Sequence, residues 1–173
     1  SAGAPCYDIT KVVTPDLKEK GGDLFYLDLS GEPFSLGGSS FAQIQNKIGS
    51  ETSTISDPDY FKRSFNLIQK FIGENKISAG HDISSGGIIT TLLEMCFPTE
   101  TAGMNLDLSS LKSTDIITLL FSENSGIILQ SNHDLKMLLG QHGITCNKIG
   151  STTEDQKIEL TYYTAKHEFD VIA

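Results

Sequence analysis

The chain has 173 residues, of which 38% are hydrophobic and 20% are charged, a composition typical of one globular domain and not of a disordered segment. Its formal net charge of −9 argues against a nucleic-acid partner, which would require a basic surface. No apolar run approaches the roughly 20 residues that span a bilayer, so no membrane association is expected. Cys6, Cys96 and Cys146 lack the spacing of a metal or disulfide pair, which predicts buried, reduced thiols and a cytoplasmic location. The chain lacks an initiator methionine, so we expect a fragment of a longer protein.

The N-terminal part divides into an arm and the start of a domain. Residues 1–22 are expected to form an extended arm or linker, because Pro5 and Pro15 bar a regular helix. The domain is expected to occupy 23–173 and to begin with a strand at 23–29, where little polar sequence interrupts the apolar residues.

Two helices are expected next. The segment "SFAQIQNKIG" predicts a short helix with one apolar face, made of Phe41, Ile44 and Ile48. A longer helix follows, with Asp57 as its cap and Pro58 in its first position. Its apolar face is expected from the helical spacing of four residues: Phe61, Phe65, Ile68 and Ile72.

The rest of the chain alternates strand and helix patterns. A short strand at 76–80 should lead into a helix at about 87–97. Further strands are expected at 104–108, 126–130, 144–150, 157–163 and 167–173, and further helices at 113–121 and 131–143. The sum predicts an α/β (α+β) fold in which helices are layered on a mixed sheet of about six strands.

Two loops share a glycine–serine composition directly before predicted helices. They are "LGGSS" at 36–40 and "HDISSGG" at 81–87. Unpaired amides at a helix N-terminus attract phosphate, glycine lets phosphate oxygens approach them, and serine adds a donor. The candidate phosphate-binding residues are therefore Gly37, Gly38, Ser39, Ser84, Gly86 and Gly87. The alternative is that both loops are ordinary Ser-Gly caps without a ligand.

Acidic residues near these loops are the other candidates. Asp82 lies just before the serines and glycines of the second loop and could bind Mg²⁺, which prefers one or two carboxylates together with water and phosphate oxygens. Its alternative role is to stabilise the positive end of the helix. His81 is expected to be a hydrogen-bonded structural residue. Glu123 and Asn124, in "LFSENSG", either present oxygens to a ligand or form a polar turn. No catalytic nucleophile is identified.

Four segments occur in an order and spacing that resembles a known family. They are "VVTPDLK", "SLGGSSFAQ", "HDISSGGIITTLLEMCF" and "LFSENSG". The pattern is similar to the phosphoribosylformylglycinamidine synthase family, at the second C-terminal-type domain of its AIR synthase-related core. The third segment departs from the family pattern at Ser85, where the family usually has Asp.

The resemblance implies an AIR synthase C-terminal-domain-like fold with partial ferredoxin-like topology. It implies membership of a ligase of purine biosynthesis that converts formylglycinamide ribonucleotide, ATP and glutamine into formylglycinamidine ribonucleotide. Asp82 would bind Mg²⁺, Ser84 would contact ATP or ADP, and Gly86 and Gly87 would lead into the helix. The site would be auxiliary, and the isolated fragment inactive.

The implied partners are the other domains of the same polypeptide, namely N-terminal-type synthetase domains and a glutaminase. Two alternatives stay open at this point. The chain is a structural or interaction module whose ligand site has decayed, or it belongs to another ATP-using enzyme of the superfamily, such as a thiamine monophosphate kinase. The "TPDLK" arm favours the purine enzyme.

Overall fold

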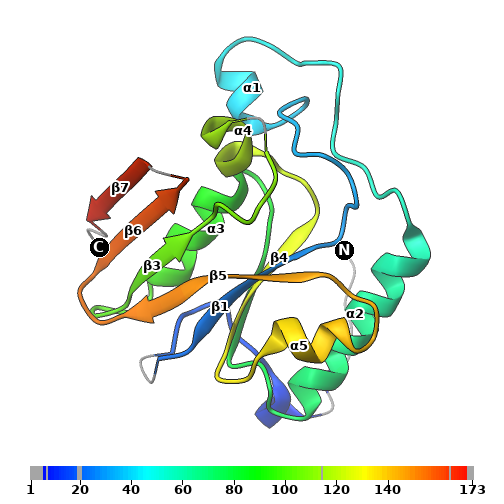
Figure 1. The fold of residues 1–173 in the computed structure, drawn as a ribbon, viewed down its shortest axis with the longest axis vertical. Helices are drawn as coiled ribbons and strands as arrows, with labels where there is room; N and C mark the ends of the chain where they lie inside the picture. Colours follow the sequence, from blue (N-terminus) through cyan, green and yellow to red (C-terminus); the bar gives the residue numbers. More distant parts are fainter. Residues whose placement is uncertain (1–5, 7, 19–20, 114, 164, 171–173) are drawn as a thin grey trace.

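The computed structural model describes residues 6, 8–18, 21–113, 115–163 and 165–170 (Figure 1). The described part contains a seven-stranded sheet in the order β2-β4-β1-β5-β3-β6-β7, one strand more than the approximate number expected. The strands are β1 (Asp23–Asp28), β2 (Ala79–Asp82), β3 (Gly103–Asp107), β4 (Gly126–Ser131), β5 (Cys146–Thr153), β6 (Lys157–Tyr162) and β7 (Ala165–Asp170). The sheet is mixed because β3 and β6 are parallel, whereas the other neighbours are antiparallel. Residues 171–173 of the predicted last strand lie outside the described residues.

Five α-helices accompany this sheet in the described part of the chain. They are α1 (Ser40–Ile44), α2 (Pro58–Gly73), α3 (Gly87–Cys96), α4 (Ile116–Phe121) and α5 (Leu135–Gly140). Two units, β1-α2-β2 and β4-α5-β5, place their strands in the order β2-β4-β1-β5. This is the strand order of a ferredoxin-like βαββαβ unit, with α3, β3 and α4 inserted between its halves. The expected partial ferredoxin-like topology is confirmed.

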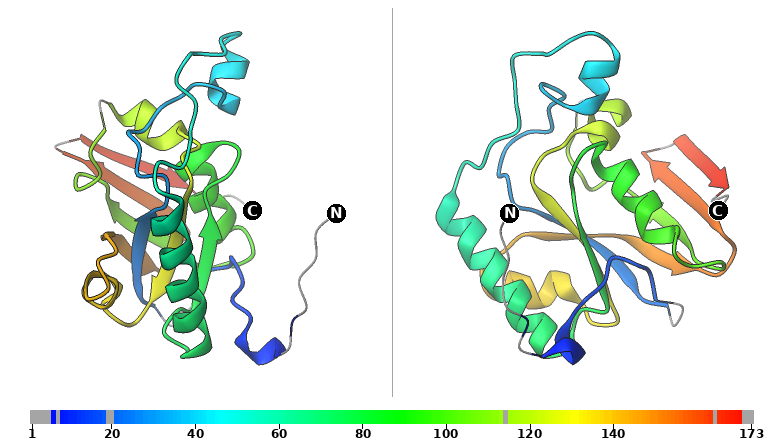
Figure 2. Two further views of the ribbon diagram at one scale, coloured as in Figure 1. Left: turned by 90° about the vertical axis from the view of Figure 1, so that its right-hand side faces the viewer. Right: turned by 180° about the vertical axis from the view of Figure 1, so that it is seen from behind.

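Strand β1 is buried from both sides, which explains its uninterrupted apolar sequence. Alternate side chains point to opposite faces of a strand. Leu24 and Tyr26 join the core beneath α3 and α4, whereas Phe25 and Leu27 join the core beneath α2 and α5. The sheet is therefore covered by helices on both faces (Figure 1, Figure 2).

Helix α2 begins as predicted, and its buried face matches the predicted one in part: Ile68 is buried, and Phe61 and Ile72 pack against the core. The Asp57 carboxylate accepts the Tyr60 amide proton, and Pro58 occupies the first turn. The side chains that the helix buries are Ser64, Leu67, Ile68 and Phe71. The prediction was wrong for Phe65, which is 46% exposed. The neighbouring Ser64 is buried in its place, and a pattern of hydrophobic residues does not predict a buried serine.

Helix α1 is shorter than predicted. It ends at Ile44, and Asn46 adopts a left-handed conformation with φ of 55°. Of the expected apolar face, Phe41 packs on the Phe121 ring, whereas Ile44 and Ile48 do not pack against this chain and are 73% and 77% exposed. Helix α1 and the segment after it lie at one end of the molecule, away from the sheet (Figure 1).

The N-terminal arm contains a single 3-10 turn at Ile9–Lys11 among its described residues, and its last part is packed against the domain. Leu17 is buried and donates its amide proton to the carbonyl of Met95, while Thr14 accepts the Gly80 amide proton. The Gln130 side chain accepts a proton from the Lys18 amide and donates to the Lys18 carbonyl. The division at residue 22 stays a prediction; residues 1–5, 7 and 19–20 of the arm lie outside the described residues.

The cysteines differ in burial. Cys96 and Cys146 are buried as expected, and burial raises the pKa of their thiols to about 11 and about 12. The expectation was wrong for Cys6, which is exposed. Within the described residues, no helix is both long and apolar enough to cross a membrane.

Candidate functional site

The segment from His81 to Gly87 connects the last residues of β2 to the start of α3. Asp82 ends the strand, and 76% of its side chain is exposed. Ser84 and Ser85 are also exposed, and neither caps the helix, since the N-cap is Gly86 without a side-chain hydrogen bond. Three oxygen-bearing side chains are therefore presented to solvent on one short loop.

His81 is the structural residue that its context predicted. Its Nδ1 lies 2.9 Å from the carbonyl oxygen of Asp82, and its Nε2 lies 3.3 Å from a carboxylate oxygen of Glu94 in α3. With both ring nitrogens beside oxygens, the imidazole links the end of β2 to α3. It thereby orients the backbone that carries Asp82.

Gly86 and Gly87 are required by packing within the chain. Their φ angles are 92° and 75°, a conformation that side chains disfavour. A Cβ on Gly87 would lie 2.6 Å from the carbonyl oxygen of Leu120 and 2.7 Å from that of Ser122. The start of α3 therefore packs directly on the backbone at the C-terminal end of α4 and on Ser122, and the Gly87 amide donates to the carbonyl of Ser84.

The 36–40 loop uses its polar groups internally. The Ser39 hydroxyl accepts the Ala42 amide proton as the cap of α1 and donates to the carbonyl of Leu36. The Gly38 amide donates to Ile48, and a Cβ on Gly37 would collide with the backbone of Glu51. The loop therefore satisfies these groups without a ligand.

The structure brings the two loops together through Glu123. One carboxylate oxygen, Oε1, accepts the amide protons of Ser40 and Gly86, each at 2.8 Å. The sequence identified Glu123 as a ligand-facing or turn residue, and did not predict that it joins both loops. Asn124 is buried and donates its side-chain amide to oxygens of Ser30, Glu32 and Pro33.

A magnesium ion would find one carboxylate ligand here. In the described part of the chain, no group of three or more His, Cys, Asp or Glu side chains is arranged to hold a metal. The exposed Asp82 carboxylate, 3.5 Å from His81, fits a site in which water and phosphate oxygens complete the coordination. The described residues of this chain could therefore contribute one protein ligand, the Asp82 carboxylate, to a bound Mg²⁺.

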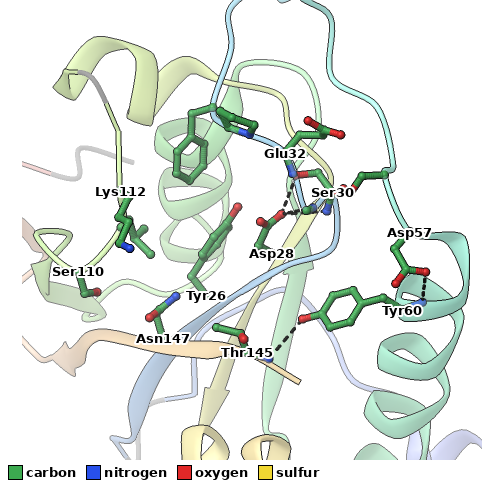
Figure 3. Close-up of a pocket in the computed structure, with 15 residues that line it drawn as sticks. Tyr26, Asp28, Ser30, Glu32, Asp57, Tyr60, Ser110, Lys112, Thr145 and Asn147 are labelled. Atoms are coloured by element: carbon green, nitrogen blue, oxygen red, sulfur yellow. Dashed lines mark hydrogen bonds between the residues drawn. The ribbon is translucent and has the colours of Figure 1, made fainter. Parts of the chain in front are cut away.

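A cavity of about 630 Å³ lies elsewhere, between the end of β1 and the start of α2 (Figure 3). Its walls include Tyr26, Asp28, Tyr60 and Lys112, and none of the residues predicted from the two loops. The Tyr26 hydroxyl is buried without a partner among the described residues, and burial raises its pKa above the ordinary value. No sequence pattern predicts this cavity, because its residues come from four separate segments.

The fold and these loops agree with a family match. Residues 22–163 match the family described as AIR synthase related protein, C-terminal domain. The chain belongs to this family.

Three sequence relatives carry the same enzyme name. The chain is 42% identical over 166 residues to an Arabidopsis thaliana protein named "Probable phosphoribosylformylglycinamidine synthase, chloroplastic/mitochondrial". It is 36% identical to the Homo sapiens phosphoribosylformylglycinamidine synthase and 38% identical to that of Dictyostelium discoideum. The matches cover 88–92% of this chain but 12% of each relative, so the chain spans about an eighth of their length. The predicted resemblance is confirmed.

Solved structures support the fold. T. maritima PurL complexed with ATP matches with a TM-score of 0.71, at 13% identity, over 94% of this chain and 27% of that one. A thiamine-monophosphate kinase from Stenotrophomonas maltophilia matches with a TM-score of 0.54, at 13% identity, over 88% of this chain and 54% of that one. At these identities the likeness shows the architecture alone.

Proposed function

We propose that the chain is a synthetase-core domain of a phosphoribosylformylglycinamidine synthase. In this role it serves a ligase of purine biosynthesis that uses ATP and glutamine to convert formylglycinamide ribonucleotide into formylglycinamidine ribonucleotide. The observation that carries the proposal is the identity of 36–42% over nearly the whole chain to three relatives with that name. The cytoplasmic location stays a prediction, since the name of one relative places it in chloroplasts or mitochondria.

The proposed contribution of this chain is one side of a Mg-nucleotide site. A T. maritima PurL has been solved with ATP and with ADP, which supports a nucleotide of this type. Asp82 would supply a carboxylate to Mg²⁺ and Ser84 a hydroxyl to the nucleotide, both from exposed positions. Bound Mg²⁺ would neutralise phosphate charge. Gly86 and Gly87 would shape the loop.

Gly37, Gly38 and Ser39 could bind phosphate, as predicted, only if the 36–40 loop changed conformation and released its internal hydrogen bonds. The Gly38 amide and the Ser39 hydroxyl already bind protein oxygens. The Gly86 amide likewise binds Glu123. We therefore assign contact with the polyphosphate to the exposed side chains of Asp82, Ser84 and Ser85. The auxiliary character of the site is proposed from the family resemblance.

The occupied amides also favour a second function, that of a structural module whose ligand site has decayed. Ser85, in place of the family's usual Asp, removes one carboxylate beside Asp82 and favours the same alternative. In this case the domain would serve the interface with the remaining domains of the polypeptide. Its exposed apolar side chains, such as Ile44 and Ile48, suit such contacts.

The two functions are separated by nucleotide binding to the full-length protein. Calorimetry would measure the affinity for ADP with Mg²⁺ and with EDTA in the wild type and in Asp82→Asn. We expect Asp82→Asn to weaken the Mg²⁺-dependent binding about tenfold, the effect of losing one charge-assisted contact. Asp59→Asn, at an exposed acid in the first turn of α2, is the matched control.

Wild-type affinity in the Asp82→Asn protein would exclude the ligand role and leave the structural module. Formation of formylglycinamidine ribonucleotide by the full-length protein, dependent on ATP and glutamine, tests the parent activity separately.

A further inference from the structure

The segment 121–124, formed by the last residue of α4 and the three residues after it, contacts residues 30–41 through every one of its side chains. The Phe121 ring stacks on Phe41, with 4.8 Å between centroids. The Ser122 hydroxyl accepts the Ser35 amide proton, and the buried Asn124 donates to three oxygens of residues 30–33. The polar groups of this segment are thus directed to the protein.

Glu123 is the member of this segment that also reaches the second loop. Its Oε1 accepts from the first residue of α1, Ser40, and from the N-cap of α3, Gly86. Because one oxygen serves both bonds, the two backbone nitrogens lie within two hydrogen-bond lengths of each other. Loops that are more than 40 residues apart in the sequence are joined at a single atom.

The β2–α3 loop depends on this bond for its position. Before the loop, the Ile83 amide donates to Gly126 of β4, which fixes the end of the strand. The Gly87 bond to Ser84 is local to the loop. Among the described residues, the hydrogen bond that ties positions 84–86 to another segment is the one from Gly86 to Glu123.

The charge of Glu123 suits this place. Amides at helix starts carry partial positive charge and favour an anion. Partial burial by itself raises the Glu123 pKa, but the amide bonds from Gly86 and Ser40 outweigh it and hold this pKa below its ordinary value. The carboxylate therefore stays ionised at neutral pH and occupies the position that a phosphate oxygen would otherwise take.

We propose that Glu123 is a positioning residue for the nucleotide site, acting as a built-in anion that fixes the β2–α3 loop, with Ser84 and Ser85, against the 36–40 loop and beside the strand-held Asp82. The proposal rests on the proposed function, since it assigns the positioned loop to Mg-nucleotide binding. It places the nucleotide on the exposed side chains of Asp82, Ser84 and Ser85. The amides of Ser40 and Gly86 bind Glu123 and not the nucleotide.

The test uses the full-length protein with Glu123→Ala, Glu123→Gln and the control Glu154→Ala. Glu154 is an exposed acid between β5 and β6, far along the chain from both loops. Hydrogen exchange at residues 36–42 and 83–87 reports whether the loops are joined. Calorimetric titration with Mg-ADP reports whether the joining matters for binding.

We expect Glu123→Ala to lose protection at both loops together and to bind Mg-ADP about tenfold more weakly, because both amides lose a charged acceptor. Glu123→Gln keeps an oxygen that can accept both protons, so its loss should be clearly smaller. Sodium formate should partly restore Mg-ADP affinity in Glu123→Ala by occupying the vacated anion position. Sodium chloride at equal ionic strength should not.

Wild-type Mg-ADP affinity in Glu123→Ala, with both loops deprotected, would overturn the positioning role. Unchanged exchange in Glu123→Ala would overturn the link itself. If Asp82→Asn binds Mg-ADP like the wild type, the proposed function of the loop as a nucleotide site is excluded. Hydrogen exchange in Glu123→Ala then tests only whether Glu123 connects the two loops. Joint deprotection keeps Glu123 as the connection between the loops, and unchanged protection removes it.

Discussion

The 36–40 loop and the 81–87 loop have similar composition but opposite chemistry. In the first, the cap serine is buried and its hydroxyl binds within the loop. In the second, Ser84, Ser85 and the Asp82 carboxylate face solvent, and the helix has no side-chain cap. Paired glycines and serines before a helix therefore do not by themselves identify a phosphate site. What distinguishes the two loops is whether their polar side chains are left for a ligand.

The glycines give the sharpest contrast between the loops. Gly87→Ala should destabilise the chain by roughly 3 kcal/mol or more, since its Cβ would lie 2.6 Å from backbone and φ is positive. Gly38→Ala should cost about 1–2 kcal/mol, because φ is also positive but the nearest atom is a Thr52 methyl at 3.4 Å. Urea unfolding of both variants measures the difference.

Gly73→Ala is the control for this pair, since a Cβ there meets no atom within 4 Å. It should be neutral or slightly stabilising. Equal destabilisation by Gly87→Ala and Gly38→Ala would contradict the claim that close packing on residues 120–122 sets the second loop apart.

Asn124 tests whether the 121–124 segment supports the first loop. Asn124→Ala should cost about 2–3 kcal/mol, because it removes a buried amide that donates to Ser30, Glu32 and Pro33. Urea unfolding gives the free energy, and Asn66→Ala, at an exposed position of α2, is the control. If both variants unfold alike, the segment does not hold the loop.

One substitution made in both loops compares their serines. Ser39→Ala should destabilise the chain by about 1 kcal/mol, since Ser39 caps α1, whereas Ser84→Ala should stay within about 0.5 kcal/mol. Mg-ADP binding by the full-length protein should reverse the order, with Ser84→Ala the weaker binder. A stability loss at Ser84 as large as that at Ser39 would count against its assignment as a free ligand.

The smallest expected effect is a pH dependence that comes from the link between the loops. The folded-state pKa of Glu123 lies below its ordinary value of 4.5, so its ionised form stabilises the fold above about pH 4.5. That contribution is lost as the pH falls through the lower folded-state pKa. Urea midpoints measured from about pH 6 down to about pH 3 should therefore fall less in Glu123→Gln than in the wild type. Parallel curves would show that the carboxylate charge contributes nothing.

Local sequence patterns predicted where helices and strands lie better than they predicted which side chains pack against the core. Asp57 and Pro58 begin α2 as expected, because a cap acts within a few residues of sequence. The buried face of α2 differs from the predicted one at two residues: Ser64 is buried and Phe65 is half-exposed. A pattern based on hydrophobicity predicts the opposite for both. The exposed Asp82 agrees with its predicted role, and that role stays a prediction.

The sequence alone determined the α/β class, the two glycine–serine loops and the family, since each depends on short-range pattern or on ordered motifs. Only the tertiary structure decided what the loops bind within the chain. The bond from Glu123 to Ser40 and Gly86 joins three segments, and Gly87 is required by the backbone of residues 120–122. Such contacts are set by how the helices and strands pack, and hydrogen bonds between distant segments leave no periodic trace in the sequence.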